Sequence, residues 1–310
     1  MASNHSWKSL RLEELVREIV EDSSSGAAQL TIKAANLYLK LLEGKPSLRH
    51  IRRLTKMLAA ARPSMPSIAN IAYRIERLIS EHLSRGIGLE EAVENSVRMT
   101  IGEYQDSLRM VVQNSIDILS RYDRILVHSY SSTVARAIEE CGRLRVYVTE
   151  SRPGYEGRTL AERLARKGLR VTLLIDAAAA YALEKEMIDA VVIGCDAILD
   201  DCSIANKVGS KMIALAAKQL EIPVNVITDL WKIAVQGFSL EEHSPEEVYA
   251  GMEKISVLNP YFEIVPSELI SIFITEEGKL DKRQLLIKLE EFWRKLMPEK
   301  KLKRRGLANL

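Results

Sequence analysis

Charged and polar side chains follow directly after six short apolar runs in the second part of the sequence. These side chains are Ser129, Glu150 with Arg152, Asp176, Asp196, Asp229 and Glu276. Runs of this length predict β-strands, and the ligands of open parallel sheets bind beyond the carboxyl ends of the strands. A carboxylate such as Asp196 can act there as a general base or hold a sugar hydroxyl. The pattern therefore predicts a polar site at one edge of a sheet.

The segment Thr149–Arg158 carries residue types that bind phosphate. It contains Arg152, Arg158 and a rigid Pro153–Gly154 turn, and it leads into a predicted helix near Thr159. A guanidinium binds phosphate through paired hydrogen bonds, and a helix N-terminus offers free N–H groups. An ordinary loop with two solvated arginines explains the same residues equally well, so this segment alone does not decide between the two interpretations.

Asn206 and Lys207 follow the fourth predicted strand. The stretch Ile204–Lys211 is predicted to open the next helix, which places an amide and an ammonium at the same strand end as Asp196. The spacing of a P-loop is absent, and so is the three-glycine pattern of a dinucleotide site. We expect Lys207 and the helix N-terminus to bind a phosphate.

The first part of the sequence contributes two polar breaks between predicted helices. One is Ser24-Ser25-Gly26 and the other begins at Arg62, directly before Pro63. Taken alone, each break is typical of a helix cap rather than of a ligand site.

The elements that must position these residues fall into two halves with different periods. Residues 1–120 show apolar side chains at helical spacing, and the stretch from Leu89 to about Leu119 is predicted as one long helix or as a pair of helices that breaks near Gly102. From Arg124 onward, short β-branched runs alternate with amphipathic helices. That alternation predicts a parallel sheet with helices on both faces, and hence an α/β protein. We predict a helical domain (1–120), a sheet domain (121–298) and a basic tail (299–310), the tail being a solvated extension or, alternatively, an RNA or partner contact. The long connection 229–269 is predicted to be functional or an interface arm.

Composition excludes several classes of protein. The 310 residues include 44 Lys+Arg and 42 Asp+Glu, a formal net charge of only +2, so binding of nucleic acid by a basic face is not expected. The apolar runs are too short for a transmembrane helix, and the N-terminus lacks the apolar core of a signal peptide, so we expect a cytoplasmic protein. Cys141, Cys195 and Cys202 show no metal-ligand spacing, so we expect neither a metal nor a disulfide framework, and no cofactor.

Several blocks match a known family in the correct order. They are Val127–Ser131, Val146–Pro153, Gly194–Asp196, Asn206–Gly209, Asn259–Pro266 and Ile274–Gly278, with Arg62–Ser64 as the best match in the first half. They resemble the superfamily of translation initiation factor 2B alpha, beta and delta subunits, which also contains methylthioribose-1-phosphate isomerase and ribose-1,5-bisphosphate isomerase. The resemblance implies a helical domain on a Rossmann-like domain, with a phosphosugar cleft between them.

The isomerases of this superfamily use a cysteine after the first strand and an aspartate after the fourth. Asp196 matches the aspartate, but Ser129 stands where the cysteine is expected. A serine hydroxyl is far less acidic than a thiol and needs an adjacent base to exchange a proton near neutral pH. His128 is not suited to that role, because neighbouring residues of a strand point to opposite faces. The initiation factor alpha subunit also carries a small residue other than cysteine there, which implies weak or absent isomerase activity.

The resemblance also implies a set of ligand-binding residues. Ser24, Ser25 and Gly26 stand where the isomerases carry an arginine–glycine pair, which favours a monophosphate or a nucleotide over a bisphosphate. The full predicted set for phosphate or ligand is Ser24, Ser25, Gly26, Arg62, Ser131, Glu150, Arg152, Arg158, Asn206 and Lys207.

Three functions remain open at this point. The first is a protein similar to the initiation factor 2B alpha subunit, which binds a phosphosugar or an AMP-like nucleotide and associates as a dimer or hexamer, with initiation factor 2 as a further expected partner. The alternative is an aldose–ketose isomerase of sugar phosphates that uses Asp196, with ribose 1,5-bisphosphate favoured over methylthioribose 1-phosphate as substrate. A structural subunit without a ligand is the third and simplest interpretation.

Overall fold

The computed structural model describes residues 3–22, 25–234, 238–241, 243–252 and 254–296. Its contacts divide the chain into two compact units. Unit 1 contains the described parts of 1–106, 231–238 and 291–302, and unit 2 contains those of 107–230 and 239–290. The predicted basic tail, 299–310, lies outside the described residues.

Unit 1 is built from helices, as the apolar spacing predicts. They are α1 (Ser3–Val20), α2 (Ala27–Leu42), α3 (Leu48–Ala61), α4 (Pro66–Ser84) and the first part of α5 (Leu89–Leu119). Pro66 occupies the first turn of α4, where its missing N–H leaves no helical hydrogen bond unmade. Of the two alternatives predicted for its last segment, the single long helix is present, because α5 continues through Gly102. Unit 1 also contains residues 231–234, and Asn70 of α4 holds this segment by donating to the carbonyls of Trp231 and Ile233, at 2.7 and 2.8 Å.

Unit 2 contains a seven-stranded sheet in the order β10-β9-β7-β4-β1-β2-β3. Its strands are β1 (Arg124–His128), β2 (Arg145–Thr149), β3 (Arg170–Leu174), β4 (Ala190–Ile193), β7 (Val224–Ile227), β9 (Ile272–Thr275) and β10 (Gly278–Leu280). All pairings are parallel except that of β10 with β9. The six predicted strands are therefore all present, and the predicted α/β class is confirmed.

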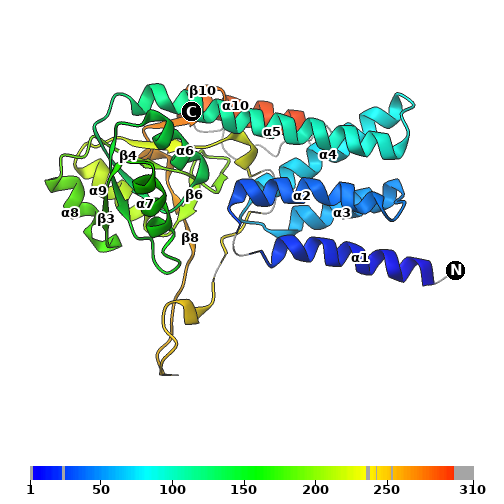
Figure 1. Cartoon of the computed structure of the whole chain (residues 1–310), viewed down its shortest axis with the longest axis horizontal. Helices are drawn as coiled ribbons and strands as arrows, with labels where there is room; N and C mark the ends of the chain where they lie inside the picture. The colour runs from blue at the N-terminus through cyan, green and yellow to red at the C-terminus, as the bar shows by residue number, and fades with distance from the viewer. Residues whose placement is uncertain (1–2, 23–24, 235–237, 242, 253, 297–310) are drawn as a thin grey trace. The chain divides into compact units, whose positions relative to one another are not determined.

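Helices cover both faces of this sheet (Figure 1). The end of α5, α6 (Ser132–Cys141) and α7 (Glu156–Arg166) share one apolar core with β1, β2 and β4. On the opposite face α8 (Ala179–Lys185) contacts α9 (Ser210–Gln219), which packs on β4 and β7. Among the described residues the last helix is α10 (Lys282–Leu296). The described chain also contains the 3₁₀ turns η1 (Asp176–Ala178), η2 (Leu230–Lys232), η3 (Pro245–Glu247) and η4 (Ser267–Leu269). None of the described helices has the length and apolar character needed to cross a membrane.

A second, three-stranded sheet corrects one prediction. It consists of β5 (Ala197–Ile198), β6 (Ile204–Lys207) and β8 (Phe262–Val265), paired antiparallel. Asn206 and Lys207 therefore lie on a strand, and the helix expected over Ile204–Lys211 begins only at Ser210. The partner strand β8 is remote in sequence, so local pattern gave no sign that Ile204–Lys207 would pair with it.

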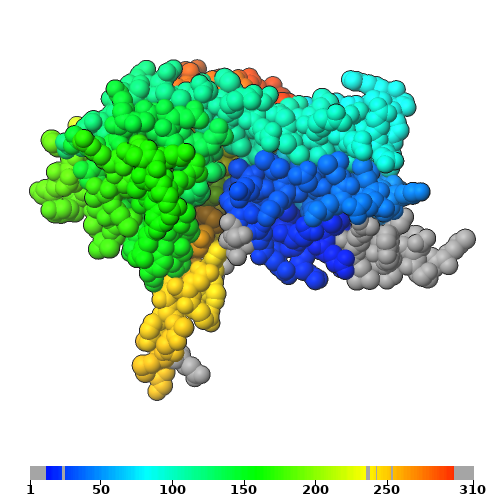
Figure 2. Space-filling view, in the orientation of Figure 1, coloured from blue at the N-terminus to red at the C-terminus, as the bar shows by residue number. Residues whose placement is uncertain are grey.

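The long connection predicted between Asp229 and Leu269 contains β8 and an extension of unit 2. We call the described residues within 239–258 (239–241, 243–252 and 254–258) the arm. Figure 2 shows the arm as a narrow projection from the α/β unit. Six of its described apolar side chains are exposed: Leu240, Val248, Tyr249, Met252, Ile255 and Leu258.

Candidate functional site

The carboxyl ends of the parallel strands bring the predicted polar residues to one edge of the sheet. Because the strand order is β9-β7-β4-β1-β2-β3, these residues follow one another along the edge. In that order they are Glu276, Asp229, Asp196, Ser129, Glu150 and Asp176. This edge is where open parallel sheets bind ligands.

The loops after β1, β2 and β4 contact one another. The N–H of Ser129 donates to Oγ of Ser151 at 2.8 Å. A Cβ on Gly194, directly before the loop that carries Asp196, would lie 2.9 Å from Cβ of Ser131. Glycine at position 194 thus allows the β4 loop to approach the β1 loop.

The backbone of these loops is strained. Ser129, Ser151 and Tyr155 adopt left-handed conformations with φ of 66°, 62° and 58°. Such values are uncommon outside glycine and are concentrated in functional loops.

Ser131, predicted to bind ligand, caps α6 by accepting from the N–H of Val134 at 3.4 Å.

His128 is a buried structural residue. Its Nε2 lies 2.8 Å from the carbonyl of Val208, and its Nδ1 lies 2.6 Å from Oγ1 of Thr149. A carbonyl only accepts, so Nε2 carries the proton and Nδ1 accepts from the threonine hydroxyl. Burial lowers the pKa of His128, which keeps the ring neutral. The imidazole therefore joins β1, β2 and the turn before α9, and both its nitrogens are engaged away from Ser129.

Carboxylates of the chain accept hydrogen bonds from the segment that is predicted to bind phosphate. Asp176 accepts from the N–H groups of Ser151 and Arg152, each at 2.8 Å. Arg158 donates to Glu150 through Nε and Nη2, at 3.1 and 2.5 Å. These internal anions fix the loop after β2 in place.

The N-terminus of α9 is filled in the same way. Oε1 of Glu263 accepts from the N–H groups of Gly209 and Lys211, at 2.7 and 2.9 Å. The buried amide of Asn206 donates to Oγ of Ser210 at 2.8 Å. The N–H groups at this helix terminus, which are predicted to bind phosphate, are therefore occupied by the carboxylate of Glu263 from β8.

Lys207 is enclosed by two side chains from other segments, Glu156 and Tyr261. Its side chain is only 2% exposed, and its Nζ lies 2.9 Å from Oε1 of Glu156 and 3.3 Å from the ring centroid of Tyr261. The hydroxyl of Tyr261 donates to the same carboxylate oxygen, and His243 stacks on the Tyr261 ring at 3.6 Å with 8° between the planes. Burial lowers the pKa of Lys207, and the ion pair with Glu156 opposes that effect.

The sequence reasoning missed Glu156, Tyr261 and His243. Glu156 lies within the predicted phosphate segment and Tyr261 within the matched block Asn259–Pro266. Neither has a local signal that links it to Lys207, because the contact depends on how α7, β6 and β8 are brought together.

Cys195 and Cys202 both contact groups other than Ser129. Cys195 is buried with its Sγ 3.0 Å from Oγ1 of Thr228. Cys202 lies 3.6 Å from the carbonyl of Lys282, and burial raises the pKa of its thiol to about 12. Within the described ranges, no group of three or more His, Cys, Asp and Glu side chains is placed to hold a metal ion.

The residues predicted in unit 1 form their own cluster. Ser25 donates from its N–H and its hydroxyl to Asp22, each at 2.8 Å, and Lys33 contacts both residues. Arg62 donates to the carbonyls of Val20 and Asp22, at 3.0 and 3.5 Å, beside the break that ends at Gly26. The structure thus places Arg62 next to the first helix break, while Ser24 lies outside the described residues.

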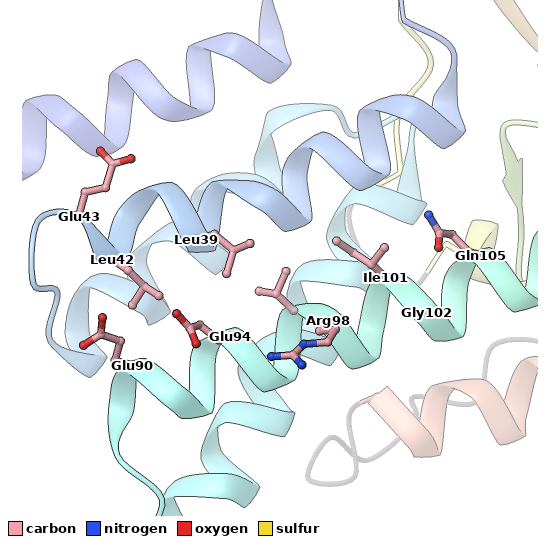
Figure 3. Close-up of a pocket in the computed structure, with 10 residues that line it drawn as sticks. Leu39, Leu42, Glu43, Glu90, Glu94, Arg98, Ile101, Gly102 and Gln105 are labelled. Carbon is pink, nitrogen blue, oxygen red and sulfur yellow. The ribbon is translucent and has the colours of Figure 1, made fainter.

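Unit 1 also has a groove of about 830 Å³ between α2 and α5 (Figure 3). Its lining combines Leu39, Leu42 and Ile101 with the charged side chains of Glu90, Glu94 and Arg98. None of the residues that line this groove belongs to the predicted ligand set.

Comparison with known proteins identifies the family of this chain. The sequence model of the initiation factor 2 subunit family matches residues 7–282. The chain belongs to this family.

Two curated relatives of this family member are isomerases. Methylthioribose-1-phosphate isomerase of Geobacillus kaustophilus is 31% identical over 300 residues, covering 86% of this chain and 83% of the relative. Ribose 1,5-bisphosphate isomerase of Methanocaldococcus jannaschii is 28% identical over 283 residues, covering 86% and 88%. Both names designate enzymes that act on sugar phosphates.

A solved structure represents the other branch of the family. Translation initiation factor eIF-2B of Pyrococcus horikoshii superposes with a TM-score of 0.73 at 25% identity, covering 87% of this chain and 96% of the other. Family membership, predicted from the blocks above, is therefore confirmed, and the chain has relatives in both functional branches.

Proposed function

We propose that this chain binds a sugar phosphate at the carboxyl edge of its parallel sheet and interconverts its aldose and ketose forms. The observation that carries the proposal is Asp196, which stands after β4, in a loop that contacts the β1 loop of Ser129. The similarity to two sugar-phosphate isomerases across 86% of the chain supports the same reading. Both observations favour the isomerase, which was the alternative in the sequence analysis, over the binding protein similar to the initiation factor 2B alpha subunit.

Asp196 is the acid/base group of the proposed reaction. Opening the sugar ring and moving hydrogen between C1 and C2 requires a group that exchanges a proton near neutral pH. Ser129 or a water molecule would take the place of the family thiol, and both are weak acids compared with a thiol. A low turnover rate follows from that difference.

The test is product analysis by phosphorus and carbon NMR. Purified protein is incubated with ribose 1,5-bisphosphate or methylthioribose 1-phosphate, and the aldose and ketose signals are followed. We expect slow conversion of one substrate and its loss, by at least about a hundredfold, in Asp196→Asn, because general acid/base groups contribute factors of this size.

The matched control for Asp196→Asn is Asp200→Asn, an exposed carboxylate in the turn that follows β5. It should convert substrate like the parent. An absence of turnover with both substrates, or equal turnover in Asp196→Asn and the parent, would reject the isomerase.

The second candidate is a binding subunit similar to the initiation factor 2B alpha subunit, and Ser129 is the observation that favours it. Such a protein would bind AMP or a phosphosugar without turnover and would contact initiation factor 2. Thermal stabilisation by AMP at millimolar concentration, together with no NMR-detected conversion, would support this candidate. If no sugar phosphate or nucleotide shifts the melting temperature, both candidates fail.

We also propose that the chain forms a homo-oligomer, a dimer or a hexamer. Support comes from the exposed apolar side chains of the arm, which include Met252 at 65% and Leu258 at 81% exposure. Exposed apolar surface of this kind is characteristic of protein–protein contacts. Light scattering of the purified chain measures the number of copies.

A further inference from the structure

Lys207 is a cationic residue of the proposed phosphate site, yet its ammonium already forms an ion pair with Glu156. Oε1 of Glu156 lies 2.9 Å from Nζ, and the Tyr261 ring covers the same atom at 3.3 Å. With 2% of the side chain exposed, an anion cannot reach Lys207 unless Glu156 or Tyr261 moves.

The backbone is shaped to admit the Glu156 carboxylate. A Cβ on Gly154 would lie 2.7 Å from Oε1 and 2.9 Å from Cδ of Glu156, so glycine at this position leaves the space that the carboxylate occupies. Glu156 also stands in the first turn of α7, where the helix dipole favours a negative charge. The β2–α7 connection thus provides both the space and a favourable electrostatic environment for the carboxylate that pairs with Lys207.

The carboxylate is nevertheless incompletely satisfied. Oε1 accepts from both Lys207 and Tyr261, whereas Oε2 is buried and has no hydrogen-bond partner among the described residues. A buried carboxylate oxygen without a donor is unfavourable, so rotation of Glu156 toward solvent recovers solvation that the closed arrangement lacks. Opening is therefore less costly than for a fully satisfied ion pair.

Tyr261 connects this pair to the base of the arm. Its ring stacks on His243, and the N–H of His243 donates to the carbonyl of Asn259 at 3.3 Å. The amide of Asn259 in turn donates to the carbonyl of Ser244 at 2.8 Å. Movement of Tyr261 away from Lys207 must therefore disturb the contacts that join the segment of His243 and Ser244 to the segment of Asn259 and Tyr261.

We propose that Glu156 is an internal anion that competes with the ligand for Lys207, and that Tyr261 is the gate over this lysine. The proposal rests on the proposed function, since it takes Lys207 as a ligand residue. An incoming phosphate replaces the carboxylate of Glu156 on Nζ, and repulsion between the two anions drives Glu156, with Tyr261, away from the lysine. The pair then selects ligands whose phosphate can displace a carboxylate and disfavours neutral sugars.

The first measurement needs no ligand. Acetic anhydride acylates accessible, unprotonated amines, and mass spectrometry reads the modification of Lys207 against that of exposed Lys211 in the same molecule. We expect Lys207 to be strongly protected in the parent and to react at least severalfold faster in Glu156→Gln and Tyr261→Phe, which weaken the ion pair and remove the phenol tether. Equal rates in the parent and both variants would overturn the gate.

The second measurement is the affinity for inorganic phosphate and AMP by calorimetry. Glu156→Gln keeps the shape of the side chain but removes the competing charge, so we expect binding about tenfold tighter, the size of one charge-assisted hydrogen bond. Unchanged or weaker binding in Glu156→Gln would overturn the competition, and weaker binding would make Glu156 a ligand-binding acceptor instead.

The control variant is Glu162→Gln, on the same helix but in an exposed pair with Arg166, and it should match the parent in both measurements. If neither phosphate nor AMP binds any variant, the proposed ligand site fails. The acylation rates still decide whether Glu156 and Tyr261 shield Lys207.

Discussion

At the scale of single residues, the guanidinium of Arg152 differs from the other predicted anion-binding groups of unit 2. Arg158, Lys207 and the N–H groups at the start of α9 are held by carboxylates of the chain. Arg152 is exposed, and its contacts in the described chain are with the hydroxyl and ring of Tyr155. It is therefore the cation best placed to meet an external phosphate without first losing an internal partner.

We predict that Arg152→Ala weakens the affinity for AMP and ribose 1,5-bisphosphate by about tenfold or more, the value of a lost charge-assisted hydrogen bond. Arg158→Ala should have a smaller effect, because its charge is already balanced by Glu150. Calorimetric titration measures both affinities. Arg166→Ala, a surface residue 77% exposed, is the control, and an effect of that size in the control would contradict the assignment.

At the scale of elements, the packing of α7 on the end of β2 positions the loop that carries Arg152. A Cβ at Gly157 would lie 1.8 Å from the carbonyl oxygen of Thr149, so the first turn of the helix rests directly on the strand. Gly209 has a comparable role before α9, where its φ is +105° and a Cβ would lie 2.9 Å from the His128 ring. Both glycines are required by a close approach of chain segments and not by a turn alone.

We predict that Gly157→Ala lowers the free energy of unfolding by about 2 to 3 kcal/mol, because the added methyl forces the helix away from the strand. Gly102→Ala should raise it by about 0.5 to 1 kcal/mol, since Gly102 lies within α5 with no atom near its missing Cβ and alanine is the better helix former. Urea unfolding measures both changes. Equal shifts in the two variants would show that the contact with Thr149 does not hold α7 in place.

At the scale of the whole molecule, a buried carboxyl links the stability of the chain to pH. Glu276, after β9, accepts from the N–H of Leu230 at 3.1 Å. Burial, followed by the charge of Asp229, raises the pKa of Glu276 from 4.5 to about 7. Between these two values the folded chain holds a proton that the unfolded chain has released, so stability is full below pH 4.5 and falls as the pH rises through 7.

We predict that Glu276→Gln removes this component of the pH dependence. The free energy of unfolding of the variant relative to the parent should increase from pH 5 to pH 8 by up to about 3 kcal/mol, the value of a shift of this size. Urea unfolding at four pH values measures the difference, and other titrating groups cancel in it. A difference that stays constant with pH would mean that Glu276 is ionised in the folded chain.

The class of fold, the six parallel strands and the family could all be predicted from the amino-acid sequence. These features depend on local apolar periodicity and on short blocks whose residues stand close together in the chain, such as Val146–Pro153. It also placed Asp196 and Ser129 at the ends of strands, because a residue directly after a buried strand must lie at the sheet edge.

The partners of the predicted residues, in contrast, depend on contacts between segments that are distant in sequence. Lys207 turned out to lie on β6 rather than at a helix start, because β6 pairs with β8, which is remote in sequence. The same pairing brings Tyr261 and Glu263 to Lys207 and to α9, while α7 supplies Glu156. Charge complementarity between distant segments leaves no periodic trace in a sequence. The internal carboxylates at the predicted phosphate donors were therefore visible only once the chain was folded.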